Sequence, residues 1–151
     1  MTEFTLPTRP AALPVSKTFF YKTVNDISIP IDIYLPPSPT KSSLPIMLFI
    51  HGGGWVGGDR LDYPRATFHR FLSLGFIVAS MDYRLLPETP LSGQLEDIRD
   101  VEPWLRTKLY LKLKDDGISV DTAKIVVVGA SAGAHLALLT VHRTSLLTLN
   151  R

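Results

Sequence analysis

The sequence predicts an α/β fold built on a mostly parallel sheet. Three apolar runs, at residues 44–50, 76–81 and 124–128, have the length and composition of strands that are buried on both faces. Segments with helical spacing separate these runs, and a strand-helix-strand order produces parallel pairing. An antiparallel hairpin at residues 17–35 is expected to lead into this sheet, with helices on both of its faces.

The hairpin is predicted from two alternating segments around a turn. Residues 17–24 and 27–35 flank Asn25 and Asp26, a pair that favours a tight turn. Isoleucine recurs at every second position of the second segment, as expected of a strand with one buried face. Prolines among residues 36–39 then end the strand, because proline cannot donate to a ladder.

Three helical segments are expected after the hairpin. Pro64 suits the first position of one helix, and Gly75 suits its end. Residues 91–109 carry apolar side chains three or four positions apart, which predicts an amphipathic helix. Pro103 lies inside it and removes a backbone donor, so we expect a kink or a restart there. Residues 134–142 are predicted to form the last helix.

Composition sets limits on the class of protein. A chain of 151 residues, 45% hydrophobic, is long enough for one domain with a substantial core. The formal charge of +2 comes from interspersed residues, which disfavours a nucleic-acid or anionic-membrane surface. Cysteine is absent, no run approaches the length of a membrane span, and the first residues do not form a signal peptide. A cytoplasmic protein is therefore expected.

A Gly-x-Ser-x-Gly motif at residues 129–133 predicts a nucleophile. Ser131 follows an apolar strand and precedes a helix, which is the context of a strained strand-to-helix turn that exposes a serine hydroxyl. Such a turn needs very small neighbours because strand and helix approach closely, and glycine and alanine flank this serine. The alternative interpretation is an ordinary glycine-rich turn.

A second glycine cluster, at residues 51–55, follows the strand at residues 44–50. Consecutive glycines let backbone N–H groups turn outward toward an oxyanion, and the N–H of Ala132 would cooperate with them. The alternative is a phosphate cradle. Neither glycine cluster is followed by Lys-Ser or Lys-Thr, and neither has the Gly-x-Gly-x-x-Gly spacing, so nucleotide binding is disfavoured.

Together, the motifs at residues 51–55, 82–88 and 129–133 resemble the hormone-sensitive-lipase-like branch of the α/β-hydrolase fold, a group of carboxylesterases and lipases. The resemblance covers about residues 17–145, with the motifs in the family's order. It divides the chain into an extended arm, residues 1–16, and a partial α/β-hydrolase domain, residues 17–151.

The resemblance implies a role for each motif. Ser131 would be the nucleophile, and Gly53, Gly54 and Ala132 would be the oxyanion donors. His51 and the stretch that begins at residue 83 would support the site without taking part in the chemistry. No metal or organic cofactor is implied, and the substrate would be a small-molecule ester. The reaction would transfer an acyl group to the serine and then hydrolyse the acyl-enzyme.

Members of that group complete their triad with an acid and then a histidine, both after the nucleophile. No Asp or Glu follows Ser131 in this sequence. His135 and His142 belong to the following helix, where helix packing and solvent exposure are the expected roles, and His69 is expected to be a solvated helix residue. Three carboxylates precede the serine and are interpreted as loop or helix-surface charges: Asp82, Asp97 and Asp100.

Two hypotheses remain at this point. One is the amino-terminal half of a serine esterase, truncated after the nucleophile helix and nearly inert by itself because the triad is incomplete. The other is a non-catalytic remnant that acts by binding or strand pairing. The strand at residues 124–128 would lie mid-sheet in a complete fold, so an exposed edge there would favour self-association.

The sequence gives one indication of the substrate. Three apolar residues near the motifs favour an uncharged acyl or alcohol group: Trp55, Leu85 and Leu86.

Overall fold

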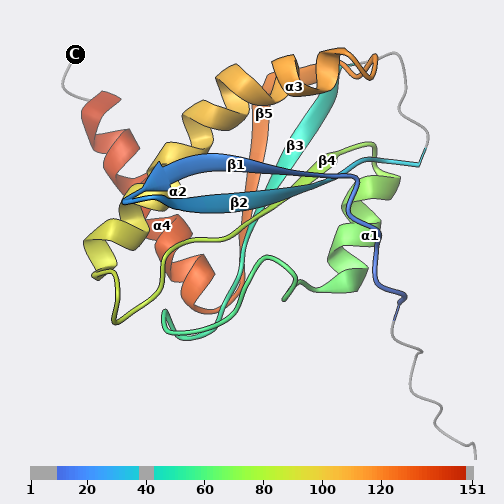
Figure 1. Ribbon diagram of the computed structural model, residues 1–151. Helices are drawn as coiled ribbons and strands as arrows, with labels where there is room; N and C mark the ends of the chain where they lie inside the picture. The colour runs from blue at the N-terminus through green and yellow to red at the C-terminus, as the bar shows by residue number, and fades with distance from the viewer. Residues whose placement is uncertain (1–9, 38–42, 149–151) are drawn as a thin grey trace, which may run out of the picture.

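A computed structural model describes residues 10–37 and 43–148 and places a five-stranded mixed sheet at the centre of the molecule (Figure 1). The strands are β1 (Lys17–Val24), β2 (Ile27–Tyr34), β3 (Leu44–Ile50), β4 (Ile77–Met81) and β5 (Val120–Gly129). The helical elements are α1 (Arg65–Ser73), α2 (Leu91–Trp104), the π-helical turn η1 (Leu105–Leu109), α3 (Tyr110–Lys114) and α4 (Ala132–Thr148).

The strand order β1-β2-β4-β3-β5 confirms the predicted α/β class. β1 and β2 form the expected antiparallel hairpin, and β2 also pairs antiparallel with β4. β3 pairs in parallel with both β4 and β5. Asn25 and Asp26 both have positive φ, 47° and 65°, which is the conformation that these residues tolerate in a tight hairpin turn.

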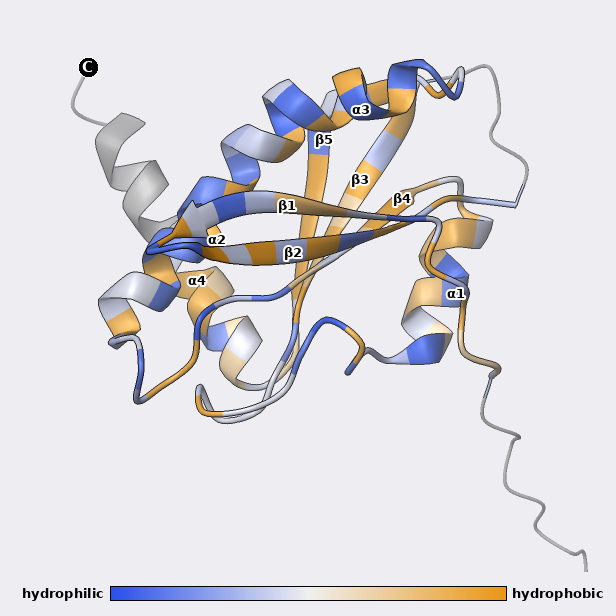
Figure 2. Ribbon diagram, in the orientation of Figure 1, coloured by the Kyte–Doolittle hydropathy of each residue, from blue (hydrophilic) through white to orange (hydrophobic). Residues whose placement is uncertain are grey.

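Helices cover both faces of the sheet, as predicted. α1 packs Phe68 and Leu72 against Met47 and Phe49 on one face. α2, η1, α3 and α4 lie on the other face, where their apolar side chains join the larger core cluster. Figure 2 shows the same division along the chain, with hydrophobic strands inside and hydrophilic residues on the outer side of the long helical segment.

Pro103 does not end the second helix. α2 passes through it and continues as η1 and then α3, so the helical segment runs from residue 91 to residue 114. Because Pro103 has no N–H, the α-helical hydrogen-bond ladder is interrupted there, and the next turn takes the wider π-helical register. The hydroxyl of Thr107 donates to the carbonyl oxygen of Pro103 at 2.7 Å. The expected irregularity is therefore a change of helical register.

β5 differs from its prediction in length and in burial. It begins at Val120, four residues before the predicted start. It is expected to be buried on both faces, but Val126 and Val127 are 43% and 41% exposed. Among the described residues, β5 lies at the end of the sheet and pairs only with β3. On α4, Leu138 is 71% exposed. No helix among the described residues is long and apolar enough to cross a bilayer.

Candidate active site

Ser131 occupies a tight turn between β5 and α4. Its φ is 49°, in the left-handed region that non-glycine residues rarely adopt and that is enriched at active sites. A Cβ at Gly129 would lie 2.5 Å from the Cα of Ala134, and a Cβ at Gly133 would overlap the carbonyl oxygen of Ile50. Both glycines of the motif are therefore required by the close approach of α4 to the strands.

The start of α4 is held by backbone hydrogen bonds. The N–H groups of Ala134 and His135 both donate to the carbonyl oxygen of Ser131, at 3.0 and 3.2 Å. The N–H of Ala130 donates to the carbonyl oxygen of Ile50 at 3.1 Å, which ties the turn to β3. Within residues 10–37 and 43–148, the N–H of Ala132 donates to no partner.

The glycine-rich loop after β3 lies against this turn. A Cβ at Gly52 would be 3.4 Å from the Cβ of Ser131. Gly53 and Gly54 have φ of 110° and 62°, so both need the conformational freedom of glycine. The N–H groups of these two glycines also donate to no partner within the described part of the chain. The structure thus brings the sequence-predicted nucleophile and glycine loop together, while their catalytic roles stay predictions.

His51 lies beneath the loop and is 1% exposed. Its Nδ1 is 2.7 Å from the carbonyl oxygen of Gly52, and its ring stacks on Tyr83 with centroids 4.3 Å apart. The Tyr83 hydroxyl donates to the carbonyl oxygen of His51 at 3.1 Å, and burial raises the pKa of Tyr83 to about 12. His51 is therefore held in a packed, hydrogen-bonded position beneath the loop, as expected of a supporting residue.

The segment after β4 fixes the far end of the loop. The carbonyl oxygen of Trp55 accepts hydrogen bonds from the N–H of Leu86 and from Nε2 of Gln94, both at 2.9 Å. Gln94 belongs to α2 and is fully buried. The loop is consequently anchored to α2 as well as to β3.

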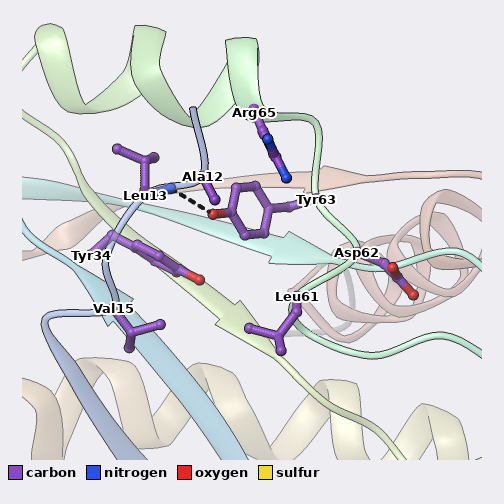
Figure 3. A pocket seen from close by; sticks show the side chains of 8 residues that line it. All are labelled: Ala12, Leu13, Val15, Tyr34, Leu61, Asp62, Tyr63 and Arg65. Atoms are coloured by element: carbon purple, nitrogen blue, oxygen red, sulfur yellow. Dashed lines mark hydrogen bonds between the residues drawn. The ribbon is translucent and has the colours of Figure 1, made fainter. Parts of the chain in front are cut away.

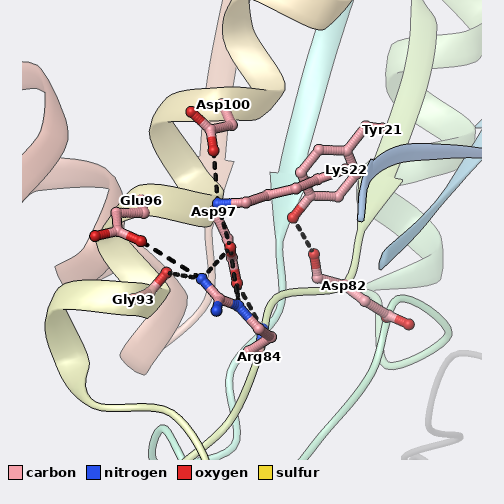
Figure 4. A network of polar contacts seen from close by, with 8 residues as sticks. All are labelled: Tyr21, Lys22, Asp82, Arg84, Gly93, Glu96, Asp97 and Asp100. Atoms are coloured by element: carbon pink, nitrogen blue, oxygen red, sulfur yellow. Dashed lines mark hydrogen bonds and ion pairs between the residues drawn. The ribbon is translucent and has the colours of Figure 1, made fainter. Parts of the chain in front are cut away.

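A buried ion-pair network holds the segment after β4 (Figure 4). Asp97 is 0% exposed and receives Nε and Nη2 of Arg84 at 2.8 to 3.1 Å, together with Nζ of Lys22 at 2.9 Å. Lys22 also contacts Asp100 at 2.6 Å. The hydrogen bonds to Asp97 raise the pKa of Arg84. Burial opposes the charge on Lys22, but its bonds to both aspartates outweigh that effect and raise its pKa.

Interpreting Asp97 as a surface charge is therefore wrong. Its spacing from Gln94, Ile98 and Val101 places it on the buried face of α2, and this pattern was a usable signal in the sequence. Asp82 is also engaged, since it accepts from the backbone N–H of Arg60 at 2.7 Å and from its Nη1 at 2.9 Å. Of the three carboxylates, only Asp100 has the predominantly exposed side chain that was expected.

No described histidine or carboxylate hydrogen-bonds to the Ser131 hydroxyl. His135 is exposed, and its ring meets Trp55 edge-on with centroids 5.5 Å apart and an interplanar angle of 81°. Its expected role in helix packing is thus replaced by a contact with the glycine loop. His69 is exposed as expected, and the side chain of His142 lies outside the described residues. The described residues contain no group of three or more potential metal ligands.

A separate hollow of about 430 Å³ lies between the first described residues and α1 (Figure 3). Its wall includes Tyr34 and Tyr63, and the Tyr63 hydroxyl accepts from the N–H of Leu13 at 3.1 Å. Arg65 donates to the carbonyl oxygen of Pro10, so this part of the arm packs along α1. None of the lining residues belongs to the glycine loop or to the turn at Ser131.

Comparison with known proteins adds a family and a fold. Residues 31–150 match the family model named BD-FAE. The chain is 42% identical over 127 residues to the non-reducing polyketide synthase pkbA of Emericella nidulans, which covers 82% of this chain and 5% of the synthase. It is also 42% identical over 123 residues to the non-reducing polyketide synthase Preu6 of Preussia isomera, covering 81% of this chain and 6% of that protein.

Solved esterases share the architecture. The butyrate-bound esterase Est2 of the Planctomycetes species Thermogutta terrifontis superposes with a TM-score of 0.68 and 27% identity, over 82% of this chain and 43% of that one. The same esterase phosphorylated by paraoxon gives a TM-score of 0.68 and 26% identity, over 88% of this chain and 49% of that one. The chain therefore spans less than half of these esterases and about a twentieth of the synthases.

Proposed function

Because the chain belongs to the BD-FAE family, an α/β-hydrolase-type family, we propose that it forms the nucleophile-bearing part of a serine hydrolase that cleaves carboxylic esters. The observation that carries the proposal is the left-handed backbone of Ser131 at a glycine-flanked turn, directly beside the loop at residues 51–55. A strained serine next to free backbone donors suits acyl transfer. The neighbouring folds are esterases, which supports the same reaction class.

In this proposal the Ser131 hydroxyl attacks the ester carbonyl carbon, the alcohol leaves, and water then hydrolyses the acyl-serine. The carbonyl oxygen becomes negative during attack and receives the N–H groups of Gly53, Gly54 and Ala132. The positive end of α4 adds to the stabilisation of that charge. Loss of one such donor typically lowers the rate by about 100- to 1,000-fold.

The base that would take the serine proton is not among the described residues around Ser131. In a serine protease, loss of the histidine lowers turnover by about a million-fold and leaves roughly 1,000- to 10,000-fold over water. We infer that the imidazole and its acid come from further polypeptide that packs on the open edge of β5. The proposal therefore expects slow chemistry from the present 151 residues alone.

The relatives point to the acyl group. The proteins pkbA and Preu6 are named as non-reducing polyketide synthases, and this chain corresponds to a small part of each. We propose that the acyl group that reaches Ser131 is a polyketide chain, so that the hydrolase belongs to a polyketide-forming system.

A non-catalytic role is the competing function, since no base contacts the Ser131 hydroxyl among the described residues. In that case the turn and the loop would be retained without acyl transfer, and the open edge of β5 would bind another strand or a second copy of the chain. The two functions differ in whether Ser131 is a reactive nucleophile.

Covalent labelling with paraoxon distinguishes them. The hydrolase proposal expects a diethylphosphoryl adduct on the peptide that contains Ser131, detected by mass spectrometry after prolonged incubation. Ser131→Ala should abolish the adduct, whereas Ser73→Ala, which alters an exposed hydroxyl on α1, should leave it unchanged. The absence of an adduct at Ser131 when the further polypeptide that supplies the base is present, or equal labelling of the Ser131→Ala protein, would contradict the hydrolase proposal and favour the binding role.

A further inference from the structure

The hollow between the arm and α1 is lined by Tyr34 and Tyr63, whose hydroxyl protons have no acceptor among residues 10–37 and 43–148. We propose that this hollow, about 430 Å³ in volume, binds a small monocarboxylate with a short apolar tail, and that the two tyrosines donate to the carboxylate. The hollow shares no lining residue with the turn at Ser131, so the inference does not depend on the hydrolase function.

The two phenol rings are neighbours. They meet edge-on, with centroids 5.5 Å apart and an interplanar angle of 64°. In Figure 3 the Tyr34 hydroxyl points into the space enclosed by Val15, Leu61 and Tyr63. The Tyr63 hydroxyl accepts the N–H of Leu13 at 3.1 Å, which leaves its own proton available to donate. A carboxylate has two acceptor oxygens and can receive both O–H groups.

The unpartnered Tyr34 hydroxyl indicates that a ligand belongs here. Tyr34 is 1% exposed, and a buried hydroxyl without a partner lowers stability, so such groups are rare in native structures. Phenylalanine would fill the same position without that cost. Burial and the neighbouring Tyr63 raise the pKa of Tyr34 above its ordinary value, so its hydroxyl stays protonated and able to donate.

The size and walls of the hollow fit an organic acid better than an ordered water. A buried water needs only about 10–15 Å³, a small fraction of this volume. The side chains of Leu13, Val15 and Leu61 line the hollow and provide aliphatic surface for a short tail. A ligand that pairs with the two hydroxyls and also covers these side chains uses both kinds of wall.

The charges in the wall favour an anion. Nη1 of Arg65 donates to the carbonyl oxygen of Pro10 at 3.1 Å, and its other N–H groups have no partner within the described ranges. Asp62 also lines the hollow, but its carboxylate accepts the N–H of Asp59 at 3.3 Å. In Figure 3 that carboxylate points away from both tyrosine hydroxyls. The guanidinium therefore remains available to a negative ligand.

The arm forms one wall of the hollow and is attached in a way that allows it to adjust. Residues 10–15 belong to no strand. Three side chains hold their backbone, with Tyr63 bonded to Leu13, Arg65 to Pro10 and the His69 ring to the carbonyl oxygen of Ala11. A carboxylate reaches the Tyr34 hydroxyl when this wall moves outward, so the amide of Leu13 should report occupancy.

Titration of the ¹⁵N-labelled chain, followed by amide NMR, tests the site. The probes are butyrate and butyramide, which have the same number of heavy atoms and differ in charge. We expect a saturable shift of the Leu13 amide with butyrate, with a Kd of about 1–10 mM, and binding of butyramide at least about 5-fold weaker. The amide of Ala132 reports separately on the turn at Ser131. No saturable shift at Leu13, which would leave an ordered water only, equal affinity for butyramide, or a shift confined to Ala132 would overturn the proposal.

Tyr34→Phe tests the hydroxyl itself. Because it removes an unpartnered group, the variant should melt at the same temperature as the parent chain or higher without ligand, and its Kd for butyrate should rise by about 10-fold or more. Tyr110→Phe, at a 43% exposed position on α3, is the matched control and should change neither quantity. A lower melting temperature for Tyr34→Phe would mean that the hydroxyl has a partner within the protein. That result, or an unchanged Kd, would contradict the proposed site.

Discussion

Replacing Arg84 by methionine should strongly destabilise the fold. The side chain supplies Nε and Nη2 to the fully buried Asp97 and Nη2 to the carbonyl oxygen of Gly93. Breaking a buried pair by removing one partner typically costs about 3–5 kcal/mol, because the remaining charge is left uncompensated. Lys22 remains 2.9 Å from Asp97 and offsets part of this loss. We therefore expect a decrease near the lower limit, about 3 kcal/mol, in the free energy of unfolding.

Urea denaturation followed by circular dichroism measures this change. Arg106→Met is the control, because Arg106 pairs with Glu102 at 2.9 Å on an exposed helix surface and also donates to the carbonyl oxygen of Thr122, without contacting a buried carboxylate. Exposed pairs of this type contribute about 0.2–1 kcal/mol. Arg84→Lys keeps the charge without the planar fork, and its intermediate loss remains measurable if the methionine variant does not fold. Equal losses for the methionine variants of Arg84 and Arg106 would refute the reasoning.

Three further predictions concern the turn, the support beneath the loop and the sheet edge. Gly133→Ala should sharply lower the yield of folded protein, since a Cβ there overlaps the carbonyl oxygens of Ile50 and His51. Gly57→Ala, with its nearest neighbour 3.9 Å away, should fold normally by circular dichroism. Tyr83→Phe removes the hydrogen bond to His51 and should lower the unfolding free energy by about 0.5–1.5 kcal/mol in urea titrations; no change would contradict that role. Val127→Lys should reduce concentration-dependent self-association of the chain in sedimentation experiments. Unchanged self-association would exclude this part of the β5 edge as the contact surface.

The fold could be predicted from sequence where the signal is local. The turn at Asn25 and Asp26, the buried strand at Leu44–Ile50 and the helix start after Pro64 each follow from neighbouring residues. The order of the strands depends on long-range packing, and the start of β5 was missed because polar residues such as Asp121 precede its apolar part. The π-helical register after Pro103 depends on how the whole helix packs, so the sequence predicted only an irregularity.

In the candidate site too, features with a local sequence signal could be predicted and long-range contacts could not. The nucleophile turn and the glycine loop have short motifs whose steric needs are visible in the sequence, and the structure places them in contact. The contact of His135 with Trp55 joins residues eighty positions apart, and no local pattern indicates it. The helical spacing of Asp97 indicates the buried face of α2, but it does not indicate which cations would pair with the carboxylate there. Arg84 belongs to the loop before α2, and Lys22 comes from β1 at the start of the sheet.

The topology also places the turn at Ser131 at the last strand of the sheet order. α2 and α4 pack on the same face of the sheet, and the connection through α2 carries the chain from β4 past β3 to β5. A right-handed connection through α4 on that face would place the next strand beyond β5, on the side away from β3. Any parallel strand that follows α4 would therefore pair with the free edge of β5 and cover Val127. The carboxyl end of that strand would lie next to the turn at Ser131, which is where a base has to be supplied for the hydrolase proposal to hold.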